Sequence, residues 1–295
     1  MAEIKVALFD IDHTLIHPST LTMHPGISEI LSPAARPFLV SHITARGAHR
    51  YVEVLNANPD LVPSPNMAVG LEYGTRVITA EDYCDPLTFR TVSHQSLNQE
   101  ERAQIVTFVE DAPGQVAAAF YPEDPTHRRI VWTPDAAAVP VLEANYGEHS
   151  EVRLGTVEDF SEMLQMHHPG MVVCRVLNPE EDLVLPPGLV TYQYGYGDGV
   201  TIDFLPQASD KSIAAKAILE NCGVSPEEAL IAGDSVADLG MLSIQGVYAI
   251  LVVSKKTRTE QFPPGIKRVT PATHGAYLAA IAPKKKTLPD TGSAS

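Results

Sequence analysis

The sequence predicts an α/β protein: a Rossmann-like core built on a parallel sheet, with an α+β cap domain inserted into it. Short apolar runs that do not alternate with polar residues, such as 6–9 and 229–233, are typical of buried parallel strands. Helical patterns alternate with these runs, and a stretch of different texture interrupts the alternation. The expected parts are a core at residues 1–81 and 202–283, an inserted cap at 82–201 and a disordered tail at 284–295.

The first part of the predicted core repeats the order strand, polar turn, helix. An apolar strand at residues 4–9 runs into a polar turn at His13 and Thr14. A second apolar run at residues 37–40 leads to Thr44 and then to a helical stretch. The other elements expected before residue 81 are a helix at 48–55 and short strands at 67–70 and 77–78.

The inserted segment mixes strands with capped helices. Asn98 and Glu101 have the spacing of a capping box, and Thr156 and Asp159 repeat that spacing before a second helix. The dipeptide Asp198-Gly199 favours a tight turn, which predicts a hairpin. The elements expected here are helices at 99–110 and 157–167, strands at 116–121, 129–133 and 171–174, and the hairpin at 189–202.

The second part of the core resumes the alternation of strand and helix. Residues 212–222 carry apolar side chains at helical spacing, and Gly223 is a typical helix end. The next apolar run ends at Asp234. The remaining elements expected are strands at 229–233, 247–253 and 266–269 and a closing helix at 272–281.

Composition narrows the class of protein. The 295 residues carry a formal net charge of -15, which argues against nucleic-acid binding because phosphate-backbone sites need clustered Lys and Arg. An acidic chain that binds an anionic phosphate should need a divalent cation. Cys84, Cys174 and Cys222 are far apart and lack metal-binding spacing, which favours free thiols in a reducing compartment. No stretch has the length of a membrane span and no signal segment is recognisable, so we expect a cytoplasmic protein with no membrane partner.

Reactive side chains follow the ends of several predicted strands. In a doubly wound sheet, ligands bind beyond the carboxyl ends of the strands. Each group is common alone, but together they supply what phosphoryl transfer needs: a nucleophile, an acid/base, a hydroxyl for phosphate, a fixed cation and a metal-binding carboxylate. The groups are Asp10 with Asp12, Thr44 with Arg46, Lys211, and Asp234 with Ser235 and Asp238.

These groups resemble, in order and spacing, the motifs of the haloacid dehalogenase superfamily. The matching motifs are Asp10-Ile11-Asp12-His13-Thr14, Thr44, Lys211 and Gly233-Asp234-Ser235-Val236-Ala237-Asp238. The long insertion between Thr44 and Lys211 lies where that superfamily's type-two (C2B) α/β cap belongs, as in its sugar-phosphatase branch.

Within that superfamily the chain resembles the sucrose-phosphate phosphatase family. The similar segments are Asp10 to Thr14, Val69-Gly70-Leu71-Glu72, Asp203-Phe204-Leu205-Pro206-Gln207, Gly233 to Tyr248, and Val269 to Ala276. Three positions depart from the family pattern: Ala237 stands where Asn is usual, Ala45 where Gly is common and Ser212 where Gly usually follows the lysine. None of the three removes a reacting group.

The resemblance implies a role for each motif residue. Asp10 is the nucleophile that forms an aspartyl-phosphate, and Asp12 is the general acid and base. Lys211 neutralises charge on the phosphoryl group, and Thr44 hydrogen-bonds a phosphate oxygen. The implied cofactor is Mg2+, held by the side chains of Asp10 and Asp234 and the carbonyl of Asp12, with Asp238 as an outer partner.

Two further residues are candidate substrate contacts. Glu72 lies near the crossing from core to cap and Gln207 lies just before Lys211; a structural or hinge role is equally compatible with each position.

The expected function is a magnesium-dependent phosphatase that hydrolyses a small sugar phosphate, of the sucrose 6-phosphate type. Two alternatives stay open: a phosphotransferase or phosphomutase on the same fold, and a non-catalytic sugar-phosphate-binding regulatory protein.

Overall fold

The computed structural model describes residues 3–112, 115–146, 148–177, 183–196, 199–254, 257 and 259–282. Contacts within the chain define two compact units. Unit 1 comprises Met1–His42, Asn58–Met67 and Leu219–Ser295, and unit 2 comprises Ile43–Ala57 and Ala68–Ile218. Among the described residues, no helix has both the length and the apolarity that crossing a bilayer would require.

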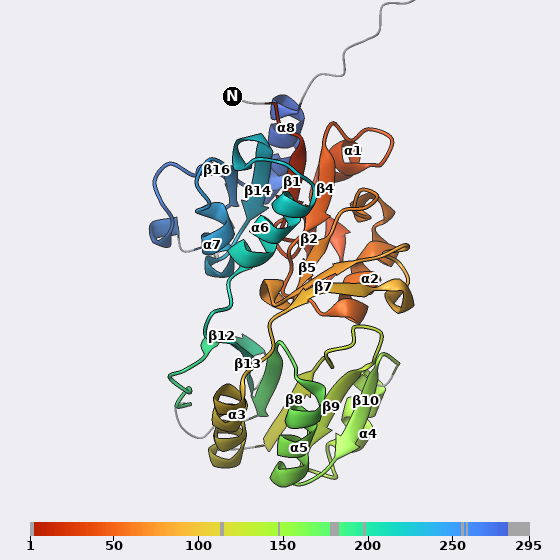
Figure 1. Cartoon of the computed structure of the whole chain (residues 1–295), viewed down its shortest axis with the longest axis vertical. Helices are drawn as coiled ribbons and strands as arrows, with labels where there is room; N and C mark the ends of the chain where they lie inside the picture. Colours follow the sequence, from red (N-terminus) through yellow and green to blue (C-terminus); the bar gives the residue numbers. More distant parts are fainter. Residues whose placement is uncertain are drawn as a thin grey trace, which may run out of the picture. The chain divides into compact units, whose positions relative to one another are not determined.

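Unit 1 contains a parallel sheet of five strands (Figure 1). Every neighbouring pair in it is parallel, and two of its three inner strands are buried along their whole length, as their unbroken apolar runs predict. The strands, in spatial order, are β16 (Lys267–Val269), β15 (Tyr248–Val252), β14 (Ala229–Gly233), β1 (Val6–Phe9) and β4 (Leu39–His42). The predicted parallel α/β class is therefore confirmed.

Short elements complete unit 1. Helix α8 packs against α1, and the contact is close because a Cβ on Gly275 would lie 2.3 Å from the carbonyl carbon of Gly26. Glycine is therefore required at position 275, next to His274. The elements are β2 (Ile16–His17), β3 (Thr22–Met23), α1 (Ile27–Leu31), α7 (Leu239–Leu242) and α8 (Pro271–Ile281).

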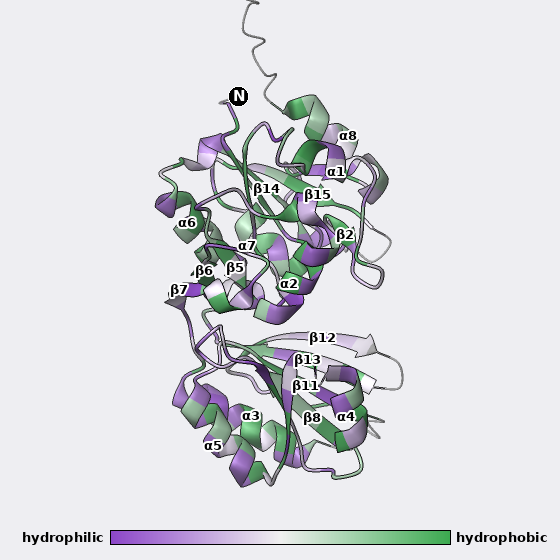
Figure 2. Ribbon diagram, turned by 90° about the vertical axis from the view of Figure 1, so that its right-hand side faces the viewer, coloured by the Kyte–Doolittle hydropathy of each residue, from purple (hydrophilic) through white to green (hydrophobic). Residues whose placement is uncertain are grey.

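Unit 2 contains a mixed sheet of six strands with two capped helices on one of its faces (Figure 2). Apolar side chains of both helices and of the sheet form one buried cluster, in which Trp132 stacks on Phe160 with ring centroids 4.7 Å apart. The strands, in spatial order, are β10 (Ser150–Leu154), β9 (Arg129–Thr133), β8 (Gln115–Phe120), β11 (Val172–Leu177), β13 (Gly199–Leu205) and β12 (Val190–Tyr196). The helices are α3 (Gln99–Asp111) and α5 (Val157–His167), with α4 (Val139–Tyr146) in contact with β10.

A second, smaller sheet of three antiparallel strands also belongs to unit 2. In the sequence, this sheet lies between Thr44 and α3. Its strands are β5 (Val69–Leu71), β6 (Arg76–Thr79) and β7 (Arg90–His94). The other helices are α2 (Ala48–Ala57) and α6 (Lys211–Asn221), which begins in unit 2 and ends in unit 1.

Several elements of the structure lack a counterpart in the sequence-based expectations: the short elements β2, β3, α1 and α7 of unit 1, and β7, α4 and β10 of unit 2. Helix α4 is short and buries none of its side chains, and β10 is an edge strand with charged residues, so neither has the buried apolar pattern on which the expected elements rested. The turn residue Asp198 and the tail at 284–295 lie outside the described residues. The division into a core and a cap at residues 82–201 stays a prediction, since the two units are defined by contacts and not by that boundary.

Candidate active site

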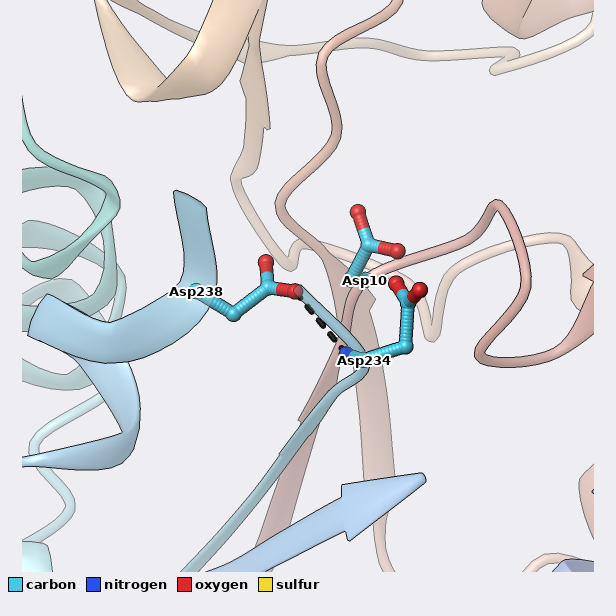
Figure 3. A group of neighbouring side chains, drawn as sticks. All are labelled: Asp10, Asp234 and Asp238. Atoms are coloured by element: carbon cyan, nitrogen blue, oxygen red, sulfur yellow. Dashed lines mark hydrogen bonds between the residues drawn. The ribbon is translucent and has the colours of Figure 1, made fainter. Parts of the chain in front are cut away.

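Two aspartates of unit 1 follow neighbouring strands of the parallel sheet. Asp10 comes directly after β1 and Asp234 directly after β14, and the register pairs Phe9 with Ala232. Parallel strands end at the same edge, so both carboxylates lie there. Oxygen atoms of Asp10, Asp234 and Asp238 all lie within 4.8 Å of one another, and Figure 3 shows the first two carboxylates side by side.

Asp238 shapes the loop that carries Asp234. Its Oδ2 accepts hydrogen bonds from the backbone N–H of Asp234 (2.9 Å), from the backbone N–H of Ser235 (2.9 Å) and from the Ser235 hydroxyl (3.1 Å). A Cβ on Gly233 would lie 2.5 Å from the Asp238 side chain, so only glycine leaves room for it. Asp238 is fully buried, and its hydrogen bonds to the two N–H groups hold the backbone of Asp234 in place (Figure 3).

Thr14 is a site residue that the sequence-based interpretation did not single out. Its hydroxyl is fully buried and donates to Asp10 Oδ2 at 3.1 Å, with Asp234 Oδ1 at 3.4 Å. A hydroxyl has one proton to donate, so the nearer Asp10 is its main partner. The available signal was its place four residues after Asp10, at the end of the same motif.

Two buried histidines hold the backbone of the loop between Asp10 and β2. His24 Nε2 and His274 Nδ1 each lie 3.0 Å from a carbonyl oxygen, of His13 and Thr14 respectively. A carbonyl only accepts, so these nitrogens donate. Burial lowers the pKa of His274 to about 4 and also lowers the pKa of His24, so both rings are neutral donors at pH 7.

Asp12 lies in the loop that these histidines support. The hydrogen bond from His24 holds the His13 carbonyl. The φ angle of His13 is 59°, which places this residue in the left-handed region. Asp12 itself is half-buried and forms a bridge with Ile16. The chain therefore turns sharply after Asp10, and Asp12 lies in this turn.

The acidic cluster has the donor chemistry that a magnesium ion prefers. Three carboxylates within 4.8 Å repel one another unless cations or protons lie among them. Mg2+ takes oxygen ligands, usually one or two carboxylates together with water. The residues present therefore fit the divalent cation that the motifs imply.

Thr44 and Lys211 belong to unit 2. Thr44 is fully buried; its backbone N–H donates to the Gly70 carbonyl and its carbonyl accepts from the Tyr73 N–H, both at 2.9 Å. Lys211 is the first residue of α6, is 2% exposed, and has its Nζ 5.9 Å from the Tyr73 ring centroid. Their joint action with the aspartates of unit 1 stays a prediction.

The two candidate substrate contacts have different surroundings. Glu72 is fully buried, and Arg76 Nε lies 3.1 Å from its Oε1. Burial raises the pKa of Glu72, and the charge of Arg76 opposes that rise. Gln207 is exposed, and its backbone N–H donates to Glu101 Oε1 at 2.7 Å. The roles of both side chains toward substrate stay predictions.

Comparison with known proteins gives one family match and one curated relative. A model of the sucrose-6F-phosphate phosphohydrolase family matches residues 185–274. A phosphoglycolate phosphatase of Haloarcula marismortui is 32% identical over 108 residues, which are 36% of this chain and 44% of that protein. The chain therefore matches less than half the length of this relative.

Solved structures match along nearly the whole chain. The haloacid dehalogenase subclass IIB sugar phosphatase BT4131 is 18% identical with a TM-score of 0.66, covering 94% of this chain and 98% of that one. A Bacteroides thetaiotaomicron phosphatase, BT1666, is 16% identical with a TM-score of 0.65 and 95% coverage of both chains. A Thermotoga maritima protein is 15% identical with a TM-score of 0.63, covering 92% and 95%.

These matches confirm the fold and the resemblance that the motifs predict. The chain has the α/β fold of the capped, subclass IIB branch of the haloacid dehalogenase superfamily, and residues 185–274 are similar to the sucrose-phosphate phosphatase family.

Proposed function

We propose that this chain, which has the fold of the subclass IIB sugar phosphatases, is a magnesium-dependent phosphomonoester hydrolase that acts on a small sugar phosphate of the sucrose 6-phosphate type. The observation that carries the proposal is the carboxylate cluster of Asp10, Asp234 and Asp238 at the carboxyl edge of the parallel sheet. The match of residues 185–274 to the sucrose-6F-phosphate phosphohydrolase model supports the substrate class.

In the proposed first step, Asp10 attacks phosphorus and displaces the sugar. A bond forms between the Asp10 carboxylate oxygen and phosphorus while the bond from phosphorus to the sugar oxygen breaks, and Asp12 gives that oxygen its proton. In the second step Asp12 takes a proton from water. The resulting hydroxide oxygen attacks phosphorus, the bond to Asp10 breaks, and phosphate leaves.

The other motif residues stabilise charge in this scheme. Lys211 and the hydroxyl of Thr44 hold the phosphoryl oxygens while charge builds on them. Asp10, Asp234 and the Asp12 carbonyl would hold a magnesium ion, which would neutralise phosphoryl charge. Asp238 keeps Asp234 in place through the Asp234 and Ser235 N–H groups, and Thr14 orients Asp10.

The test is a screen of many sugar phosphates in the presence of Mg2+. We expect the wild type to release phosphate from at least one of them, and Asp10→Asn to lose turnover. Asp135→Asn is the matched control, because the Asp135 carboxylate accepts a local turn N–H, that of Ala137, in unit 2. Substantial turnover by Asp10→Asn would overturn the mechanism.

Two outcomes would favour the alternatives. In 18O-labelled water a hydrolase puts solvent oxygen into phosphate, whereas a phosphotransferase or phosphomutase moves the phosphoryl group to another sugar hydroxyl without it. A wild type that binds a sugar phosphate in calorimetry yet never turns it over would favour a regulatory binding protein.

A further inference from the structure

Residues 72–74 adopt a backbone conformation that side chains disfavour. Their φ angles are 53°, 58° and 86°, so Glu72, Tyr73 and Gly74 are all in the left-handed region. A non-glycine residue there is strained and persists only when its surroundings hold it. Two such residues in succession indicate that the position of the Tyr73 side chain is strongly constrained.

The same segment lies directly against the start of α6. A Cβ on Gly74 would lie 3.0 Å from the Ala214 Cβ and 3.3 Å from the Lys211 Cα. The absence of a side chain at Gly74 therefore lets the segment lie directly against the first turn of the helix.

The Tyr73 side chain is anchored at its hydroxyl and on its ring. The hydroxyl donates to Asp203 Oδ2 at 2.7 Å, and the Tyr194 hydroxyl donates to the same oxygen. The ring stacks on Tyr192, with centroids 4.7 Å apart and planes 16° from parallel. Tyr73 is 8% exposed and Asp203 3% exposed, so these contacts form away from solvent.

The protonation states suit this arrangement. Burial raises the pKa of Tyr73 well above its usual value, and the nearby Asp203 raises it further. Burial also raises the pKa of Asp203, while the hydrogen bonds from Tyr194 and Tyr73 oppose that rise. Both tyrosines therefore stay protonated and donate to Asp203 at neutral pH.

We infer that Tyr73 is a positioning residue for Lys211. The Lys211 ammonium lies 5.9 Å from the centroid of the anchored ring, a distance at which an ammonium is attracted to an aromatic face. The ring thus limits where the ammonium of this 2%-exposed lysine can lie. This inference rests on the proposed function, in which Lys211 holds the phosphoryl group.

A double-mutant cycle tests the inference. Tyr73→Leu removes the ring, and we expect it to lower kcat/KM about tenfold in the wild-type background, the upper part of the range for a buried cation–π contact. In the Lys211→Ala background we expect the same change to lower kcat/KM less than about twofold, because the lysine that it positions is gone. Tyr83→Phe, a buried tyrosine of the same unit that contacts Phe89, is the control and should change neither value.

Each result decides the question. Equal, additive losses in the two backgrounds would overturn the inference, since a merely structural role of Tyr73 does not depend on Lys211. If Tyr73→Leu does not fold, the same cycle with Tyr73→Phe applies, for which we expect about a threefold loss with Lys211 present and none without it. A wild type that hydrolyses no sugar phosphate removes the proposed function and this inference together, whereas an active wild type with an additive cycle removes the inference alone.

Discussion

The orientation of Asp10 depends on the loop that follows it and on two histidines that support this loop. The Thr14 hydroxyl donates to its carboxylate, while His24 and His274 fix the carbonyls of the loop in between. The loop is preorganised, which is the arrangement that lets a nucleophile act without rearrangement.

Removal of the Thr14 hydroxyl should slow catalysis. Thr14→Val keeps the shape of the side chain but takes a hydrogen bond from the Asp10 carboxylate. A bond to a charged group is worth about 1.5–3 kcal/mol, so we expect kcat/KM to fall roughly tenfold or more. Thr14→Ser keeps the hydroxyl and is the matched control. Unchanged kinetics in Thr14→Val would show that this bond does not orient Asp10.

The burial of Glu72 leads to a separate prediction on stability. Glu72→Gln leaves the buried Arg76 charge without its partner, and breaking a buried ion pair costs about 3–5 kcal/mol. We therefore expect a lower free energy of unfolding in urea and an unchanged KM for the sugar phosphate. A raised KM at unaltered stability would instead support the predicted substrate contact. Gln207→Ala, at an exposed side chain, is the companion variant for that role.

At the level of whole elements, local sequence signals located helix starts well. The capping boxes expected at Asn98 and Thr156 are both present, and α3 and α5 begin at the next residue. Glu101 does more than cap: Oε2 accepts from the Asn98 N–H, and Oε1 accepts from the Gln207 N–H. One carboxylate thus ties the start of α3 to the loop that precedes Lys211.

Loss of Glu101 should therefore cost more than loss of an ordinary cap. Glu101→Ala leaves two backbone N–H groups without their acceptor, and we expect a destabilisation of roughly 2 kcal/mol in urea unfolding. Asp159→Ala is the matched control, because Asp159 occupies the same capping position in α5 and is exposed. Equal losses in the two variants would show that the contact to Gln207 adds nothing.

For the molecule as a whole, the negative charge and the acidic cluster predict that a divalent cation would stabilise the folded state. The formal net charge of -15 favours uptake of a divalent cation, and three carboxylates at one site repel one another without it. A ligand that binds only the folded state stabilises it by mass action.

Magnesium should raise the melting temperature. At 100 times its Kd a bound ion adds about 2.7 kcal/mol, which thermal unfolding with and without Mg2+ measures directly. We expect Asp234→Ala to abolish the shift and Asp135→Asn to keep it, with EDTA reversing the effect in the wild type. An equal shift in Asp234→Ala would place the ion elsewhere.

The sequence alone determined the parallel α/β class and most strands and helices, since buried strands and capped helices are set by local patterns such as 229–233 and Asn98 with Glu101. It also placed Asp10 and Asp234 at strand ends. Only the tertiary structure decided that their carboxylates meet with Asp238, that Thr14 orients Asp10, and that Tyr73 faces Lys211. Those contacts join residues up to 228 positions apart, and their distances depend on sheet register and burial, which no local pattern encodes.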